Sequence, residues 1–343
     1  MYRLDDFVDN SMPFKARLKS GEARKRKKPG YRVTNAREYN QSLKKRGQLS
    51  LLCPEGDLKA LFINAEPYVP GVSGRQQTYT PAYIEFIFLL YRLHNWGMRQ
   101  ITGYMDEYWA VRGLEMAVPS FAQLSARFAT LEARLTQRCE RLARKLARGE
   151  AATLITDSTG MKFGRARAWY KEKYGQHASR TPWSKVHLSI DPDMNVHAVQ
   201  VTDTSVSDSE ALDALVSVDM PVDRVIADGA YYSIERTQAW VDSGVLPVIP
   251  PPAHAVIHGE SHTRWHDRIV GYINEKGSVY AFHKKYGYGL RSLVEAQISR
   301  IKRCIGERLL TRRPESQQQE GIAIANLLNR WNAFGRSVSV KIV

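Results

Sequence analysis

The stretch TLITDSTGMK, residues 153–162, begins the part of the chain that determines the fold. Its first residues are apolar and β-branched, which predicts a buried strand, and the polar residues from Asp157 onward predict a turn. The stretch KVHLSIDPDMNVHAVQVTD at 185–203 has two apolar segments around DPDMN, which predicts a β-hairpin. Together they predict three strands, the first of which ends beside an acidic residue.

Helices and strands alternate after this hairpin. SDSEALDALV at 207–216 predicts a capped helix, and DRVIADGAYYS at 223–233 predicts a buried strand that ends at Asp228. A further helix and the short strand VLPVIPP at 245–251 follow. The order strand, hairpin, helix, strand, helix, strand, helix predicts an α/β fold in which helices flank a mixed sheet.

Residues 80–145, which precede the sheet, have the pattern of helices. One helix is expected at 98–111, and another, which starts with the capping-box pattern SFAQ, at 120–135. A helix, a short break and a capped helix resemble a helix-turn-helix, in which 120–131 would be the recognition helix. Any helical hairpin has the same pattern, so both interpretations stay open.

Positive charge is concentrated near the start of the chain. The 343 residues carry a net charge of +15, and residues 15–46 alone hold thirteen Lys or Arg and two Glu. Within them stands a run of five consecutive bases, namely Arg24, Lys25, Arg26, Lys27 and Lys28. Because neighbouring bases repel one another, we expect this arm to bind nucleic acid, with a solvated tail as the alternative.

Other features of the sequence argue against a membrane or secreted protein. The longest apolar run, IEFIFLL at 84–90, is far shorter than the roughly 20 residues of a membrane span. The N-terminus has no apolar signal core. The three cysteines lie far apart with no CxxC pair, which is typical of reduced thiols. We therefore expect a cytoplasmic protein with a polyanionic partner.

Three acidic residues are candidates for a catalytic site. Asp157 and Asp228 follow apolar strands, and side chains in that position gather at the edge of an α/β sheet. The third, Glu295, stands among the bases of YGYGLRSLVEAQISRIKR at 286–303. A single Asp after a strand is more often a turn former or a helix cap, but three such acids in one chain favour a site.

The segment around Glu295 has two stripes when it is drawn as a helix. At about 100° per residue, Tyr288, Arg291, Glu295 and Lys302 fall within about 60° of one another. An apolar stripe lies beside them and contains Leu290, Val294, Ile298, Ile301 and Ile305. An ordinary amphipathic helix in which Glu295 pairs with Arg291 would have the same pattern, so helix geometry alone does not decide.

Carboxylates that converge repel one another, and their pKa values rise unless a cation compensates them. Mg²⁺ takes oxygen ligands, typically one or two carboxylates together with phosphate and water. Two such ions can activate a nucleophile and stabilise the leaving oxygen of a phosphodiester. The bases beside Glu295 would then hold the phosphate backbone. This chemistry favours a metal site over a simple ion pair.

The same residues resemble a known family. Asp157, Asp228 and Glu295, with the spacing Tyr288-x2-Arg291-x3-Glu295-x6-Lys302, resemble the DDE transposases of bacterial insertion sequences. DSTGMK, WSKVHLSID, ADGAYYS and RSLVEAQISRIKR are similar to the family named for insertion sequence five. So are YRVTNAREYNQSLKKRG and SQQQEGIAIANLLNR, so the resemblance extends from about residue 30 to 335.

The resemblance implies a ribonuclease H-like catalytic core behind an N-terminal helical, helix-turn-helix-like DNA-binding region. It implies that Asp157, Asp228 and Glu295 hold Mg²⁺ or Mn²⁺, with two ions expected, and that the substrate is double-stranded DNA with terminal inverted repeats. Tyr288, Arg291 and Lys302 would lie near the scissile phosphate, and Lys185 is a further candidate DNA contact. The implied assembly is a homodimer in a synaptic complex, in a bacterial cytoplasm and near the nucleoid.

These expectations divide the chain into a basic arm at 1–50, a helical DNA-binding domain at 51–148, a catalytic domain at 149–313 and a C-terminal helix and tail at 314–343. A short insertion is expected at about 251–287, covering the active site or touching DNA ends. It contains His254, His258, His262 and His266, each four residues apart. A zinc site is a minor alternative there, because Gly259 interrupts the helix and HGESH is not the HExxH order.

The sequence leaves three functions open. The first is a DNA transposase that cuts at the ends of an insertion sequence and joins them to target DNA. The second is a catalytically silent DNA-binding protein derived from a transposase, which would not need three acids. The third is a ribonuclease H-like nuclease without joining activity, which the basic arm and the helical region disfavour.

Overall fold

The computed structural model describes residues 30–63, 78–136, 139–163 and 182–342, so the basic run Arg24 to Lys28 lies outside the described residues. The chain divides into two compact units. In the smaller unit, β1 (Gly30–Val33) pairs antiparallel with β8 (Ser339–Ile342), and most of α2 (Ala36–Arg46) belongs to it. The sequence analysis did not foresee this pairing, although SVSVKIV at 337–343 alternates polar and apolar residues as a strand does.

The larger unit is built on a mixed sheet. Its strands lie in the order β4-β3-β2-β5-β6, and β7 pairs with the far end of β2. β2 is antiparallel to β3 and parallel to β5, so the sheet is mixed, as the sequence predicts. The strands are β2 (Ala152–Phe163), β3 (Trp183–Ile190), β4 (Val196–Thr202), β5 (Val222–Ile226), β6 (Leu246–Val248) and β7 (Arg308–Leu309). This arrangement fits a ribonuclease H-like core.

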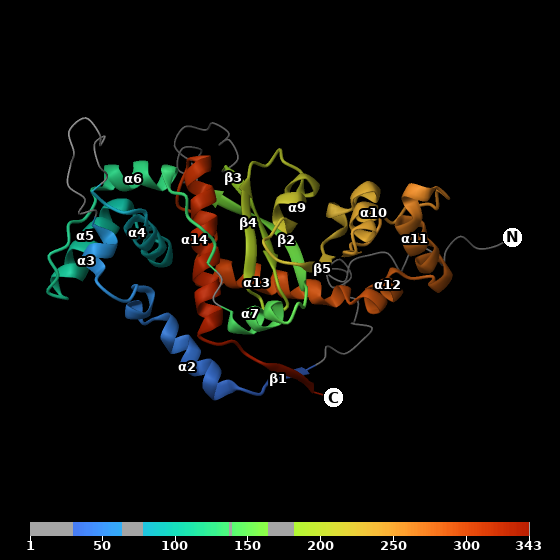
Figure 1. The fold of residues 1–343 in the computed structure, drawn as a ribbon, viewed down its shortest axis with the longest axis horizontal. Coiled ribbons are helices and arrows are strands. Elements are labelled where there is room, and N and C mark those ends of the chain that lie inside the picture. Colours follow the sequence, from blue (N-terminus) through green and yellow to red (C-terminus); the bar gives the residue numbers. More distant parts are fainter. Residues whose placement is uncertain (1–29, 64–77, 137–138, 164–181, 343) are drawn as a thin grey trace, which may run out of the picture. The chain divides into compact units, whose positions relative to one another are not determined.

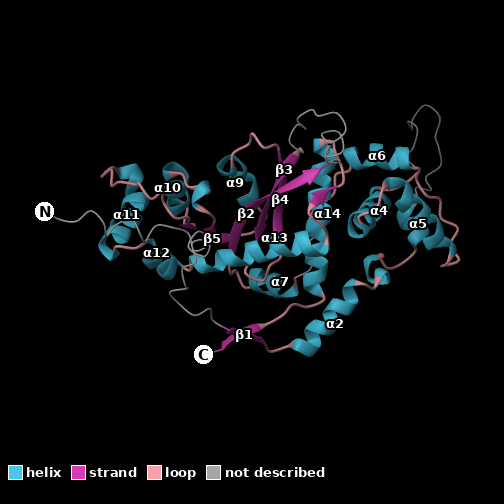
Figure 2. Cartoon of the chain, turned by 180° about the vertical axis from the view of Figure 1, so that it is seen from behind, coloured by secondary structure: helices cyan, strands magenta, loops and turns pink. Residues whose placement is uncertain are grey.

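Helices cover both faces of the sheet (Figure 1). On one face lie α13 (Ser292–Cys304), which crosses in front of the strands in Figure 2, and α14 (Pro314–Ala333). On the other face lies α9 (Asp208–Val216), which contacts β2, β3 and β4. Since side chains alternate between the faces of a strand, Asp157 lies on the α13 face and Ser158 on the α9 face.

Helices before the sheet pack against α14. Those in direct contact with α14 are α4 (Pro81–His94) and α6 (Phe121–Thr130), while α3 (Leu58–Phe62) and α5 (Met98–Ala110) pack against α4. The last helix before the sheet is α7 (Glu140–Ala147). Ser120 caps α6 in a capping box with Gln123, as the sequence predicts. Phe128 of α6 stacks on Phe88 of α4 at 3.9 Å between ring centroids, so the inner side of α6 belongs to the core. A role of α6 in reading DNA stays a prediction.

One buried ion pair joins α4 to α14. Arg92 Nε lies 3.1 Å from Glu320 Oε1, and both side chains are 0% exposed. Glu320 also accepts hydrogen bonds from the backbone N–H groups of Leu310 and Thr311 and from the Thr311 hydroxyl. A buried carboxylate needs such a complete set of donors, because its desolvation is costly.

Three details of the sequence analysis are wrong. The helix expected at 120–135 ends at Thr130, because the backbone of Leu131 is extended. The polar residues from Asp157 onward form no turn, because pairing with β3 continues as far as Lys162 and keeps β2 extended. Leu290 is not in the apolar stripe, because residues Tyr288–Arg291 form a 3₁₀ turn before α13 and leave Leu290 36% exposed. The rest of that stripe faces inward, with Val294, Ile301 and Ile305 buried.

The segment at 251–287 contains α11 (Arg264–Lys276) and α12 (Val279–Tyr286), and α10 (Ile234–Asp242) lies between β5 and β6 in the chain. Within the described ranges, no helix is long and apolar enough to cross a membrane.

Candidate active site

The three acidic residues predicted from the sequence come from three different elements of the larger unit. Asp157 lies within β2, two residues beyond Ile155, whose partner Ile226 is the last residue of β5. Asp228 follows β5 and caps a 3₁₀ turn by accepting a hydrogen bond from the N–H of Ala230. Glu295 lies in the first turn of α13. The structure brings all three to one edge of the sheet.

Arg291 connects the three carboxylates. Its Nη2 lies 3.0 Å from Asp157 Oδ2 and 2.9 Å from Asp228 Oδ2, and its Nη1 lies 2.5 Å from Glu295 Oε1. The pairing of Arg291 with Glu295, which the sequence left as an alternative to a shared site, is therefore present together with the convergence of the two aspartates. The guanidinium of Arg291 is thus shared by three carboxylates.

The carboxylates differ in their exposure to solvent. The side chain of Asp157 is 15% exposed, whereas those of Asp228 and Glu295 are 43% and 56% exposed. Burial raises the pKa of Asp157, and the charges of Asp228 and Glu295 raise it further, while Arg291 and the N–H of Ser158 oppose this rise. Asp157 is thus the member of the set whose charge most needs a nearby cation.

The neighbouring carboxylates also act on Arg291. Burial lowers the pKa of Arg291, but Asp157, Asp228 and Glu295 outweigh burial, so that the net shift is upward. The guanidinium is therefore charged at every physiological pH, and the local field favours positive charge. Oxygen donors in such a field suit hard divalent cations such as Mg²⁺ and Mn²⁺.

Among the described residues, no three His, Cys, Asp or Glu side chains converge closely enough to form a ready metal site. The three carboxylates are spread around a guanidinium, which is wider than a metal ion. Their chemistry fits a metal, because all three present oxygen atoms to one cation.

Tyr288 and Lys302 occupy different parts of the same segment. Tyr288 stacks on His283 with 4.3 Å between ring centroids, and burial raises its pKa to about 12. Its phenol is therefore protonated and able to donate a hydrogen bond at neutral pH. Lys302 lies in the last turn of α13, seven residues or about 10 Å along the helix axis from Glu295. Within the described chain, it forms no ion pair with the three carboxylates.

Lys185 has partners inside the protein. Its Nζ donates to the Val206 carbonyl at 2.7 Å and lies 3.4 Å from Asp208, on the α9 face of the sheet. Asp208 also accepts a hydrogen bond from the Ser158 hydroxyl at 3.3 Å. This polar cluster supports β2 directly behind Asp157, and the sequence analysis missed it because α9 meets β2 only in the folded chain. A DNA contact by Lys185 stays a prediction.

Of the histidines of 251–287, His258 and His266 lie in ring contact, with 5.1 Å between their centroids, but no third metal-binding side chain among the described residues joins them. His266 is buried between Tyr232, whose hydroxyl lies 2.6 Å from Nδ1, and the carbonyl of Val256. His262 is exposed and lies beside Glu260. Within the described residues no metal-binding group exists there, so the minor zinc alternative has no structural support.

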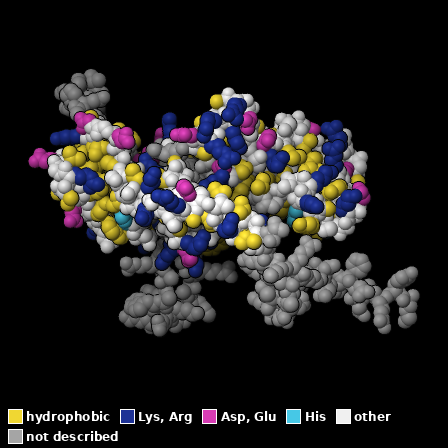
Figure 3. Space-filling model, turned by 90° about the horizontal axis from the view of Figure 1, so that it is seen from below, with side chains coloured by type: hydrophobic (Ala, Val, Ile, Leu, Met, Phe, Trp, Pro, Cys, Tyr) yellow, Lys and Arg dark blue, Asp and Glu magenta, His cyan; other side chains and the backbone are white. Residues whose placement is uncertain are grey.

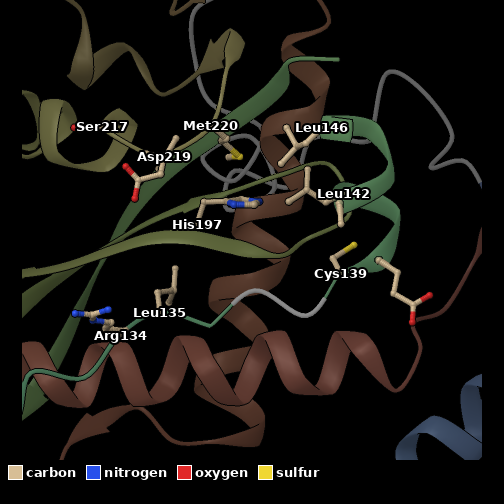
Figure 4. Close-up of a pocket in the computed structure, with 12 residues that line it drawn as sticks. Arg134, Leu135, Cys139, Leu142, Leu146, His197, Ser217, Asp219 and Met220 are labelled. Atoms are coloured by element: carbon tan, nitrogen blue, oxygen red, sulfur yellow. The ribbon is translucent and has the colours of Figure 1, made fainter. Parts of the chain in front are cut away.

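A cavity of about 740 Å³ lies away from the three carboxylates. It is an open pocket lined by α7, by Arg134 and Leu135, by His197 of β4 and by the segment 217–220 (Figure 4). None of Asp157, Asp228, Arg291 and Glu295 lines it, so its volume has no bearing on the chemistry of the carboxylate cluster.

Two families of known proteins match the chain. A family described as "Transposase DDE domain" matches residues 148–330, which is more than half of the chain and includes all three carboxylates. A second family with the same description matches residues 44–165, which include the helical region before the sheet and all of β2.

Proposed function

This chain belongs to the DDE transposases and is a DNA transposase, and we propose that it cuts and joins DNA at the terminal inverted repeats of an insertion sequence. The motifs DSTGMK, ADGAYYS and RSLVEAQISRIKR support its placement in the family named for insertion sequence five. The observation that carries the proposal is the contact of Arg291 with Asp157, Asp228 and Glu295, since the two aspartates lie far from each other and from Arg291 and Glu295 in the sequence.

DDE transposases generally use divalent metal ions. In this chain Asp157, Asp228 and Glu295 would hold Mg²⁺ or Mn²⁺, and two ions are expected. Bound ions of this kind lower the pKa of an attacking water or hydroxyl and stabilise the charge of the reacting phosphate.

The residues of the site would act on the DNA strand as follows. Arg291 would move from the carboxylates to a phosphate oxygen, where its planar donors fit two oxygens at once. The protonated phenol of Tyr288 would donate to a neighbouring phosphate, and Lys302 would hold the strand farther along α13. Attack by water breaks the bond between phosphorus and the 3′ oxygen, and the 3′-hydroxyl that is released attacks a target phosphate.

Other parts of the chain would bind and arrange the DNA. The basic arm at 1–50 and the helical domain at 51–148, with 120–131 as its recognition helix, would bind the inverted repeats. The domain at 149–313 would carry out the chemistry, with 251–287 near the DNA ends and 314–343 as the C-terminal helix and tail. Two copies would pair the two ends in a synaptic complex, in the cytoplasm and near the nucleoid.

The test is an end-joining assay. Purified protein would be incubated with labelled element-end DNA, taken from the sequence flanking the gene, with a target plasmid and Mg²⁺. Asp157→Asn would be compared with Asp213→Asn. Asp213 also forms an ion pair with an arginine, Arg236 at 2.9 Å, but on an exposed surface of α9, which makes it a matched control.

Nicking and joining by the wild type and by Asp213→Asn, but not by Asp157→Asn, would support the proposal. Cleavage without joined product would instead indicate a nuclease. End binding without cleavage in Mg²⁺ and in Mn²⁺ would indicate a DNA-binding protein that has lost its activity.

A further inference from the structure

The short helix α7 has an apolar side and a basic side. On the apolar side Leu142 is buried, and Leu142 and Leu146 point toward His197 and Met220 across the 740 Å³ cavity (Figure 4). This packing orients the helix, so that its other side faces solvent.

Four cations share the solvent side of α7. At about 100° per residue, Arg141, Arg144, Lys145 and Arg148 lie within about 100° of one another, on the side away from Leu146. Together with Glu150 they line a surface hollow of about 360 Å³. Lys and Arg side chains also gather in the middle of the face that Figure 3 shows. The hollow is therefore bounded almost entirely by positive groups.

Little inside the chain compensates this charge. Arg141 lies 3.3 Å from Asp193, and Arg148 lies 3.9 Å from Glu150, both with well-exposed guanidinium groups. Arg144 Nε donates weakly to the Glu140 carbonyl at 3.4 Å. Over the described ranges, no acidic side chain is paired with Arg144 or Lys145.

The spacing of the cations destabilises the helix. Arg141 and Lys145 are four residues apart, as are Arg144 and Arg148, and like charges at this separation repel. The helix dipole favours cations in the last turn, where Arg144 and Lys145 lie, but four cations on one side of a short helix still repel one another, and an external polyanion would relieve that repulsion. An ordinary solvated face would intersperse acids among the bases, and α7 carries only Glu140, in its first turn.

We propose that the basic side of α7 binds the phosphate backbone of double-stranded DNA without regard to sequence, at a surface separate from the carboxylate site. Arg148 and Asp157 are nine residues apart in the chain, so they can be separated by at most about 32 Å, which is less than one turn of B-DNA, about 34 Å. The distance between α7 and the carboxylates is therefore shorter than one helical turn of a duplex. The inference rests on the proposed function only in taking double-stranded DNA as the partner.

The test measures binding without cleavage. The Kd for a fluorescent 30-base-pair duplex of arbitrary sequence would be measured by anisotropy in EDTA, over a series of salt concentrations. Arg144→Gln/Lys145→Gln removes two cations that have no acidic partner. The control, Arg312→Gln/Arg313→Gln, removes two neighbouring exposed cations that lie just before α14. Both variants lower the net charge equally, and thermal melting would verify that both are folded.

We expect the α7 variant to bind roughly tenfold more weakly near 100 mM salt and to lose about 2 from the slope of log K against log salt. The conservative variant Arg144→Lys/Lys145→Arg should bind like the wild type. An unchanged slope in the α7 variant, or an equal loss in the control, would overturn the proposal. Because the assay uses neither element ends nor metal, it is independent of the transposition chemistry.

Discussion

Arg291 and Arg92 both contact carboxylates, but Arg291 keeps 19% of its side chain exposed, whereas Arg92 and its partner Glu320 are completely buried. Around Arg92 there is one carboxylate, and its remaining hydrogen-bonding capacity is satisfied by Leu310 and Thr311. Around Arg291 there are three carboxylates, two of them about half exposed. The first arrangement joins α4 to α14, and the second is open to solvent. Exposure and excess negative charge thus distinguish a site from a structural ion pair.

The largest effect that this comparison predicts is on activity. Glu295→Gln removes one oxygen charge from the open cluster and should reduce strand cleavage at least 10³-fold, or about 4 kcal/mol of barrier. Because Glu295 is largely exposed, the melting temperature should hardly change. Gel-based cleavage assays with element-end DNA would measure the rate, and binding of that DNA should be largely retained. Loss of end binding in this variant would argue against a metal-ligand role for Glu295.

Substitution in the buried pair of Arg92 and Glu320 should instead reduce stability and leave cleavage intact. Glu320→Gln leaves the buried charge of Arg92 without an acidic partner and should lower the free energy of unfolding by about 3–5 kcal/mol. Urea denaturation monitored by tryptophan fluorescence would measure the change, with Asp213→Asn of the exposed Arg236 pair as control, for which at most about 1 kcal/mol is expected. Cleavage by folded Glu320→Gln at low temperature should persist. A midpoint shift no larger than that of the control would refute the structural role.

This difference was only partly predictable from the sequence. Their positions after apolar strands made Asp157 and Asp228 candidates, the spacing of the segment around Glu295 made it the third, and alternating strands and helices predicted the sheet, because these signals are local. Arg92 stands in an apolar helix with no nearby acid, and Glu320 lies 228 positions later, so only the fold brings them together. The continuation of β2 past Asp157 was missed for the same reason, since it depends on the pairing with β3.

The next largest predicted effect is a loss of stability when a side chain is added where α14 packs closely against the sheet. A Cβ on Gly321, next to Glu320, would lie 2.8 Å from Val201 Cγ2 and 3.2 Å from Val199 Cγ2. Gly321→Ala should therefore cost about 1–3 kcal/mol through overpacking.

The matched control is Gly103→Ala in α5, where a Cβ would meet no atom within 4 Å. It should stabilise the protein by up to about 1 kcal/mol, because alanine favours the helix. Urea midpoints would show the two shifts in opposite directions. Equal shifts of the same sign would mean that α14 can move away from β4 at little cost.

The smallest effect concerns a buried carboxylate whose partners are all local. Burial alone would raise the pKa of Asp191, but hydrogen bonds from His197 and from the backbone and side chain of Asn195 lower it overall. The folded state thus favours the ionised form, which stabilises the protein above the unfolded pKa of about 3.9. This stabilisation is lost as the pH falls through the lower folded value.

Asp191→Asn should accordingly reduce stability by about 1 kcal/mol at pH 7, where a charge-assisted hydrogen bond is lost. The difference between wild type and variant should shrink below about pH 4, as Asp191 of the wild type becomes protonated. Urea midpoints of both proteins at pH 7 and in steps from pH 5 to pH 3 would measure it. A difference between the two midpoints that grows toward acid pH would mean that Asp191 is protonated in the folded protein at neutral pH. In that case local hydrogen bonds would not replace an arginine in keeping a buried carboxylate charged.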